Sequence, residues 1–102
     1  MIIYNTTFHA EDDAAARFID WLRSEYIPAA VASGHLSSPR LTRILANDGN
    51  PGKSYSLQFS ADSMEALQDW YSTTGNNLVD ALEKEFGQLV AGFSTLMEEV
   101  EL

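Results

Sequence analysis

The sequence predicts an α+β fold with one four-stranded antiparallel sheet and helices on one of its faces. Two observations predict it. Extended and helical segments follow one another in the order strand, helix, strand, strand, helix, strand, and the strongest turn signal separates the second strand from the third. Since the chain has 102 residues, we expect a single domain over residues 1–102.

The composition narrows the possible functions. The 15 acidic and 6 basic residues give a formal net charge of -9, which argues against partners such as nucleic acid or an anionic membrane surface. There is no cysteine, so disulfides and cysteine metal sites are excluded. The N-terminal segment does not resemble a signal peptide and no apolar run is long enough to span a membrane, so the expected location is cytoplasmic.

The first half of the chain predicts a strand and an interrupted helix. Met1 to His9 is rich in β-branched and aromatic residues, as strands are, and acidic residues 11–13 suit the N-terminus of a helix. Pro28 lacks a backbone N–H, so we expect a break or kink at Ile27. Gly34 is expected to end the helical region.

A hairpin is predicted in the middle of the chain. Residues 35–46 alternate as in a strand, and the loop that follows, residues 47–52, is dense in Asn, Asp, Gly and Pro. In the next strand Tyr55, Leu57 and Phe59 share one face, and serines and Gln58 share the other.

The last third predicts a second interrupted helix and a final strand. Asp62 and Glu65 have the spacing of a capping box at the start of the helix. Gly75 is expected to interrupt it, with a new cap at the following asparagines, and Gly87 to end it. Residues 89–97 complete the ferredoxin-like βαββαβ order. The second face of such a sheet carries apolar residues here, so we expect a homodimer that buries it.

Several segments together resemble the domain-of-unknown-function family DUF4286: MIIYNTTF, WLRSEYIP with the following ASG, RLTRIL, SYSLQF and FSTLMEEV. The resemblance covers nearly the whole chain and departs at Tyr26, where a histidine is expected. It implies membership of the dimeric α/β barrel superfamily, which includes antibiotic-biosynthesis monooxygenases and haem-degrading enzymes. It implies no activity, because none is assigned to the family.

The resemblance to haem-degrading enzymes implies roles for a strand-one asparagine and a helix-two tryptophan, and Asn5 and Trp70 fall at these places. The haem-ligating histidine has no counterpart around Asp80, since His9 and His35 lie in other elements. We therefore expect no haem and no other cofactor. The carboxylates at residues 11–13 and those of Glu98, Glu99 and Glu101 lack the spacing of a calcium loop, so no metal site is expected.

A cofactor-independent oxygenase needs only an apolar pocket with a few hydrogen-bond donors, and six side chains are candidates to line it: Asn5, Tyr26, His35, Arg43, Gln58 and Trp70. Several also have structural interpretations. Trp70 has the helical spacing of a core residue, and His35 is placed to cap a helix end. Asn5 and Gln58 suit a hydrogen-bonded network between strands, and Arg43 suits an ion pair across a dimer interface.

Three hypotheses for function follow. The first is a dimeric protein that binds a small molecule or a protein partner between helices and sheet. The alternative is a cofactor-independent monooxygenase-like enzyme that uses the same space, and the third is a purely structural or regulatory dimer. They differ in whether Trp70 and its polar neighbours line an open cavity or fill the core.

Overall fold

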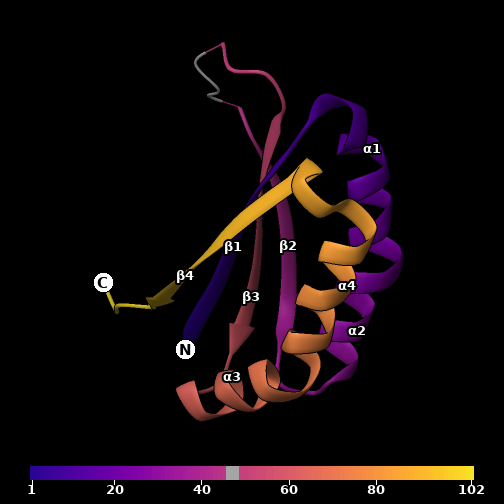
Figure 1. Cartoon of the computed structure of the whole chain (residues 1–102). Coiled ribbons are helices and arrows are strands. Elements are labelled where there is room, and N and C mark those ends of the chain that lie inside the picture. The colour runs from indigo at the N-terminus through magenta and orange to yellow at the C-terminus, as the bar shows by residue number, and fades with distance from the viewer. Residues whose placement is uncertain (46–48) are drawn as a thin grey trace.

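The computed structural model is a four-stranded antiparallel sheet with helices on one face (Figure 1). It describes residues 1–45 and 49–102. The strand order is β2-β3-β1-β4, with bounds β1 (Ile2–Ala10), β2 (Ser37–Ile44), β3 (Lys53–Ala61) and β4 (Val90–Glu98). The predicted βαββαβ order is therefore confirmed.

The strand register assigns each side chain to one of two faces. Tyr4 pairs with Phe59, and Asn5 pairs with Gln58. Side chains that pair directly across antiparallel strands point to the same face. Tyr4 and Phe59 pack in the core under the helices, so Asn5 and Gln58 lie on the opposite, open face.

Aromatic residues fill the core between the sheet and the helices. The largest fully buried side chains are Trp70, Phe18, Phe59, Leu22, Leu57 and Leu67. Phe8 of β1 packs edge-on against Phe18, with ring centroids 5.1 Å apart. Such edge-to-face pairs are favoured by the ring quadrupoles and hold the helices to the sheet.

The chain does not break at Ile27, but a π-helical turn interrupts the regular α-helix just before this residue. The first helical region comprises α1 (Asp12–Trp21), a π-helical turn (Leu22–Tyr26) and α2 (Ile27–Ala32). Ile27 keeps helical dihedrals (φ -62°, ψ -46°), and its N–H bonds the carbonyl of Leu22. Because the widened turn places Pro28 in the first turn of α2, no N–H is required of it.

The π-helical turn also keeps one side of this region in the core. The buried residues recur at every fourth position: Ala14, Phe18, Leu22, Tyr26 and Ala30. In a regular α-helix each step of four residues overshoots a full turn by about 40°, so the last residue would lie about 160° away from the first. The wider turn compensates for this drift.

The second helical region comprises α3 (Met64–Trp70), a π-helical turn (Tyr71–Gly75) and α4 (Asn76–Phe86). The expected interruption takes the form of the π-helical turn that ends at Gly75, and the predicted new cap at the asparagines is wrong, since Gly75 and Asn76 keep helical dihedrals and no side chain caps the start of α4. A Cβ at Gly75 would lie 2.9 Å from the Trp70 ring. The glycine therefore makes room for Trp70 instead of ending the helix.

The start of α3 also differs from the prediction. Ser63, not Asp62, is the N-cap residue, and its hydroxyl accepts a hydrogen bond from the Ala66 N–H (3.1 Å). The helix thus begins one residue later than a capping box of Asp62 and Glu65 requires.

The remaining sequence signals agree with the structure. Gly34 has φ +81°, and its N–H bonds the carbonyl of Val31 at the end of the helical region. β2 and β3 form the predicted hairpin. Asn47 and Asp48 of its predicted loop lie outside the described residues. No helix in the described ranges is long and apolar enough to cross a membrane.

Candidate functional site

A pocket with a volume of 160 Å³ lies between the helices and the β4 side of the sheet. Three residues of β1, one of the first helical region, two of α4 and three of β4 line it: Tyr4, Thr6, Phe8, Tyr26, Val79, Leu82, Gly92, Phe93 and Ser94. Val79 is 54% exposed and marks the side of α4 on which the pocket opens. None of the lining residues is charged.

The polar atoms of this pocket form a connected hydroxyl network. The Thr6 and Ser94 hydroxyls, on the neighbouring strands β1 and β4, lie 3.1 Å apart. The Ser94 hydroxyl donates in turn to the Tyr4 hydroxyl (3.3 Å). Tyr4 and Thr6 are buried, whereas Ser94 is exposed at the β4 side of the pocket. Burying the Tyr4 and Thr6 hydroxyls without partners would cost free energy, and the bonds to Ser94 avoid this cost.

Two further tyrosines adjoin the network and are held neutral. Burial, with the nearby Tyr4 and Tyr71 adding to it, raises the pKa of Tyr26 well above its ordinary value. Burial and a hydrogen bond with Tyr4 raise the pKa of Tyr71 to about 12. Both hydroxyls therefore keep their protons at neutral pH and can donate hydrogen bonds.

Of the six predicted site residues, only Tyr26 lines this pocket. Trp70 is 1% exposed, and its ring centroid lies 5.3 Å from that of Tyr4, so it fills the core. Its indole N–H has no hydrogen-bond partner among the described residues.

Asn5 and Gln58 lie on the other face of the sheet. The Asn5 carboxamide accepts a hydrogen bond from the Ser56 hydroxyl and donates one to the Thr7 hydroxyl (3.2 Å). Gln58 is the next residue across on β3. Asn5 and Trp70 are therefore separated by the sheet and cannot contact one small ligand together.

His35 and Arg43 lie neither in the pocket with Tyr26 nor beside Asn5 and Gln58. His35 follows Gly34 and uses its backbone N–H to bond the Ser33 hydroxyl (3.2 Å). Arg43 is exposed on β2. The structure thus does not bring the six residues together, and a ligand contact for any of them stays a prediction.

Sequence reasoning missed Thr6, Ser94 and Tyr4 as pocket residues. A signal for Thr6 was present, because it is the one aliphatic polar side chain in the face made of Ile2, Tyr4, Thr6 and Phe8, which otherwise presents apolar or aromatic side chains. Ser94 carried no comparable signal, since its place beside Thr6 depends on the register of β4 against β1.

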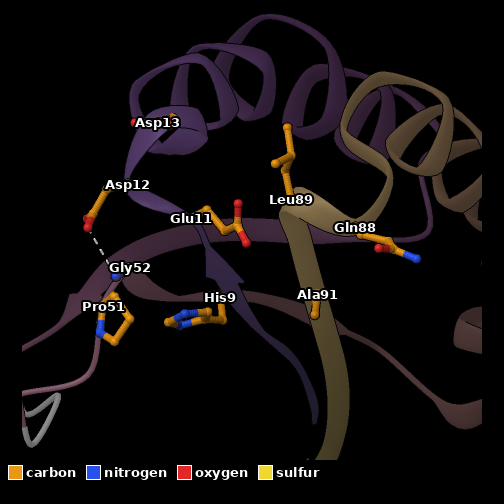
Figure 2. A pocket seen from close by; sticks show the side chains of 9 residues that line it. All are labelled: His9, Glu11, Asp12, Asp13, Pro51, Gly52, Gln88, Leu89 and Ala91. Atoms are coloured by element: carbon orange, nitrogen blue, oxygen red, sulfur yellow. Dashed lines mark hydrogen bonds between the residues drawn. The ribbon is translucent and has the colours of Figure 1, made fainter.

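A wider cleft of 410 Å³ lies where β1 meets α1 (Figure 2). Figure 2 shows the Asp12 carboxylate directed at Gly52, and it accepts a hydrogen bond from the Gly52 backbone N–H, with 3.3 Å between nitrogen and oxygen. His9 shares a hydrogen bond with the Ser54 hydroxyl (2.9 Å). Within residues 1–45 and 49–102 no group of three potential metal ligands gathers. The polar side chains of Asp12 and His9 here tie the start of β3 to β1 and α1.

The sheet with helices on one face defines the ferredoxin-like class, and solved structures of this class match nearly the whole chain. An EthD family protein from Bacillus halodurans C-125 is 18% identical (98% of this chain, 100% of that one, TM-score 0.72). A putative antibiotic biosynthesis monooxygenase from Deinococcus radiodurans is 21% identical (100% and 95%, TM-score 0.69). A protein from an uncultured marine organism, described as dimeric ferredoxin-like, is 13% identical (100% and 97%, TM-score 0.72).

The family model described as "Domain of unknown function (DUF4286)" matches residues 1–100, and the chain belongs to this family. No curated protein matches it. The similarities to solved structures, at these low identities, establish the ferredoxin-like fold and do not establish a function.

Proposed function

We propose that the protein is a homodimer that binds a small, largely apolar molecule in the pocket between α4, β1 and β4. The observation that carries this proposal is the uncharged hydroxyl network of Tyr4, Thr6 and Ser94 inside an otherwise apolar pocket. Small-molecule sites are typically apolar with a few polar groups that orient the ligand.

The volume and chemistry of the pocket define the ligand class. Its 160 Å³ is close to that of cavities of about 150 Å³ that bind benzene. Because no charged side chain lines it, an ionic ligand would lose its hydration without compensation. The best ligand is a single aromatic ring, or a molecule of similar size, that carries one hydroxyl or carbonyl oxygen.

The homodimer is supported by the open face of the sheet. Phe93 is 65% exposed and Met97 39%, both on β4, and the register places them on the face without helices. A second copy would remove this apolar surface from water. The solved structures described as dimeric ferredoxin-like proteins share this fold.

A pair of probes that match in size tests the ligand proposal. Phenol and toluene differ by a hydroxyl in place of a methyl group, so the network should favour phenol by about tenfold in Kd, as one hydrogen bond allows. Ser94→Ala should reduce this preference, while Gln58→Ala on the open face should leave it unchanged. Equal affinity for both probes in the wild type, or no binding of either, would contradict the proposal.

The second candidate is a cofactor-independent oxygenase in the same pocket, favoured by the protonated Tyr26 hydroxyl. A neutral, buried donor can stabilise the oxyanion of an ionised phenol, which then gives electrons to O₂. One oxygen atom becomes the new carbonyl of a quinone and the other leaves as water, with two substrate hydrogens. Oxygen consumption with phloroglucinol, abolished in Tyr26→Phe, would support it, and no consumption above the uncatalysed rate would contradict it.

A further inference from the structure

The open face of the sheet holds a second pocket with a different chemistry. It has a volume of 260 Å³ and lies where β2 and β3 meet the start of β1, lined by Ile3, Ser38, Arg40, Gln58, Phe59 and Ser60. The sheet separates it from the 160 Å³ pocket that contains the Tyr4, Thr6 and Ser94 hydroxyls, called the hydroxyl pocket from here on, because Gln58 pairs with Asn5 on the face without helices.

A bulge in β2 shapes this pocket. Ser37 pairs with Ser60 and Arg40 with Gln58, so three steps along β2 match two along β3. The extra residue leaves Ser38 at φ +53°, a left-handed conformation that is uncommon for residues other than glycine. Bulges of this kind redirect side chains, and here the redirected segment carries Arg40.

The polar side chains of the pocket are all hydrogen-bond donors without a protein partner. Across the described residues, no hydrogen bond or ion pair engages the guanidinium of Arg40, the amide of Gln58 or the hydroxyls of Ser38 and Ser60. No carboxylate lines the pocket, although the chain has 15 acidic residues. A cluster of unpaired donors around one cation is the arrangement that recognises an anion.

We infer that the pocket around Arg40 is a carboxylate-binding site. The planar guanidinium fork matches the two oxygens of a carboxylate, and the nearby hydroxyls and amide can complete their hydrogen bonds. Ile3 offers an apolar surface to the carbon chain that bears the group. The net charge of -9 repels a phosphate dianion more strongly than a singly charged carboxylate.

The carboxylate can come from a free small molecule or from a second copy of the chain. Glu99 lies just beyond β4, where its N–H donates to the carbonyl of Met1 (3.0 Å). A two-fold axis parallel to the strands, between two open faces, would place β4 of one copy over β2 of the other. This second source rests on the proposed homodimer, whereas the first does not.

The first arm of the test is an acetate titration of the full chain, followed by amide chemical shifts, with chloride at the same ionic strength as reference. Shifts should concentrate at Ser38, Arg40 and Gln58 and weaken at least about tenfold in Arg40→Gln. Arg43→Gln, a matched change at another exposed arginine of β2, should leave them unchanged. This result assigns the site to a free carboxylate.

The second arm measures the dimer dissociation constant by sedimentation. If Glu99 of a second copy fills the site, acetate shifts are absent from the dimer, and Arg40→Glu and Glu99→Arg each weaken the dimer at least about tenfold. Combining both changes should restore it, which a general loss of stability would not. The inference is overturned if acetate causes no shifts at the pocket and neither single change alters the dimer.

The same experiments separate this inference from the proposed function. A monomer that binds acetate at Arg40 would refute the homodimer and support the carboxylate site. Phenol binding that persists in Arg40→Gln would show that the hydroxyl pocket works independently, whatever the result at Arg40.

Discussion

The two faces of the sheet handle polar groups in different ways. On the helix-covered face, Thr6, Ser94 and Tyr4 are neutral and bonded to one another. On the open face, Asn5 is satisfied by hydroxyl neighbours and Arg40 keeps its charge exposed. Burying a charged group costs far more free energy than burying a hydroxyl that is hydrogen-bonded. The face covered by helices therefore favours neutral polar groups, and the open face tolerates a charge. One pocket suits a neutral ligand and the other an anion.

The largest expected difference between the faces concerns packing. Trp70→Ala should lower the free energy of unfolding by about 3–5 kcal/mol, because it empties the core beside Tyr4. Gln58→Ala on the open face should change it by less than about 1 kcal/mol. Urea denaturation of both variants measures the contrast.

Trp70→Phe separates core packing from a polar role of the indole. The indole N–H bonds nothing in the described part of the chain, so its loss removes no hydrogen bond. We expect this variant to retain most of the stability and all phenol binding. A loss of phenol binding at unchanged stability would instead place Trp70 in the ligand site.

Gly75→Ala should have a smaller effect. The added Cβ would meet the Trp70 ring at 2.9 Å, and such overpacking costs about 1–3 kcal/mol, partly offset by the better helix propensity of alanine. Asn76→Ala, one residue further on an exposed position, is the matched control and should be neutral or stabilising. If both variants gain stability, the glycine is not required for packing against Trp70.

The smallest expected effect is a loss of stability in alkali that originates on the helix-covered face. The ordinary pKa of tyrosine is about 10, and Tyr71 in the fold has a pKa of about 12, with that of Tyr26 also raised. Between these values the unfolded chain releases a proton that the folded chain keeps, so the free energy of unfolding falls as pH rises.

This contribution is fully present below pH 10 and declines as the pH approaches about 12. Urea midpoints measured across this range should fall less steeply in Tyr71→Phe and Tyr26→Phe than in the wild type. A slope that neither substitution changes would mean that other groups cause the alkaline loss.

The strands were predictable because their signals are local. The alternation of Tyr55, Leu57 and Phe59 with polar residues indicates directly which side of the strand is buried. Gly34 indicates the end of a helix, because glycine readily adopts the left-handed conformation found there. From the order of these elements the ferredoxin-like sheet follows, and the family resemblance agreed with it.

The site was not predictable to the same degree because it depends on register. Thr6 meets Ser94 only through the pairing of β1 with β4, which are 88 residues apart at this contact. Asn5 and Trp70 were expected to share a space, but one lies on each side of the sheet. The position of Arg40 depends on a β-bulge in β2, which no local sequence pattern predicts.

The π-helical turn at residues 22–26 holds one residue more than a regular α-helix of the same phase needs. Removing Ser24, which is exposed and bonds only the carbonyl of Asp20, would allow a regular α-helix in its place. Ala14 and Ala30 would then lie about 60° apart around the helix axis, instead of about 160° in a regular helix that kept all the residues, so α2 would keep its buried side. A single-residue deletion within this turn should therefore be tolerated better than one in a regular α-helix, where every later residue is rotated by about 100°.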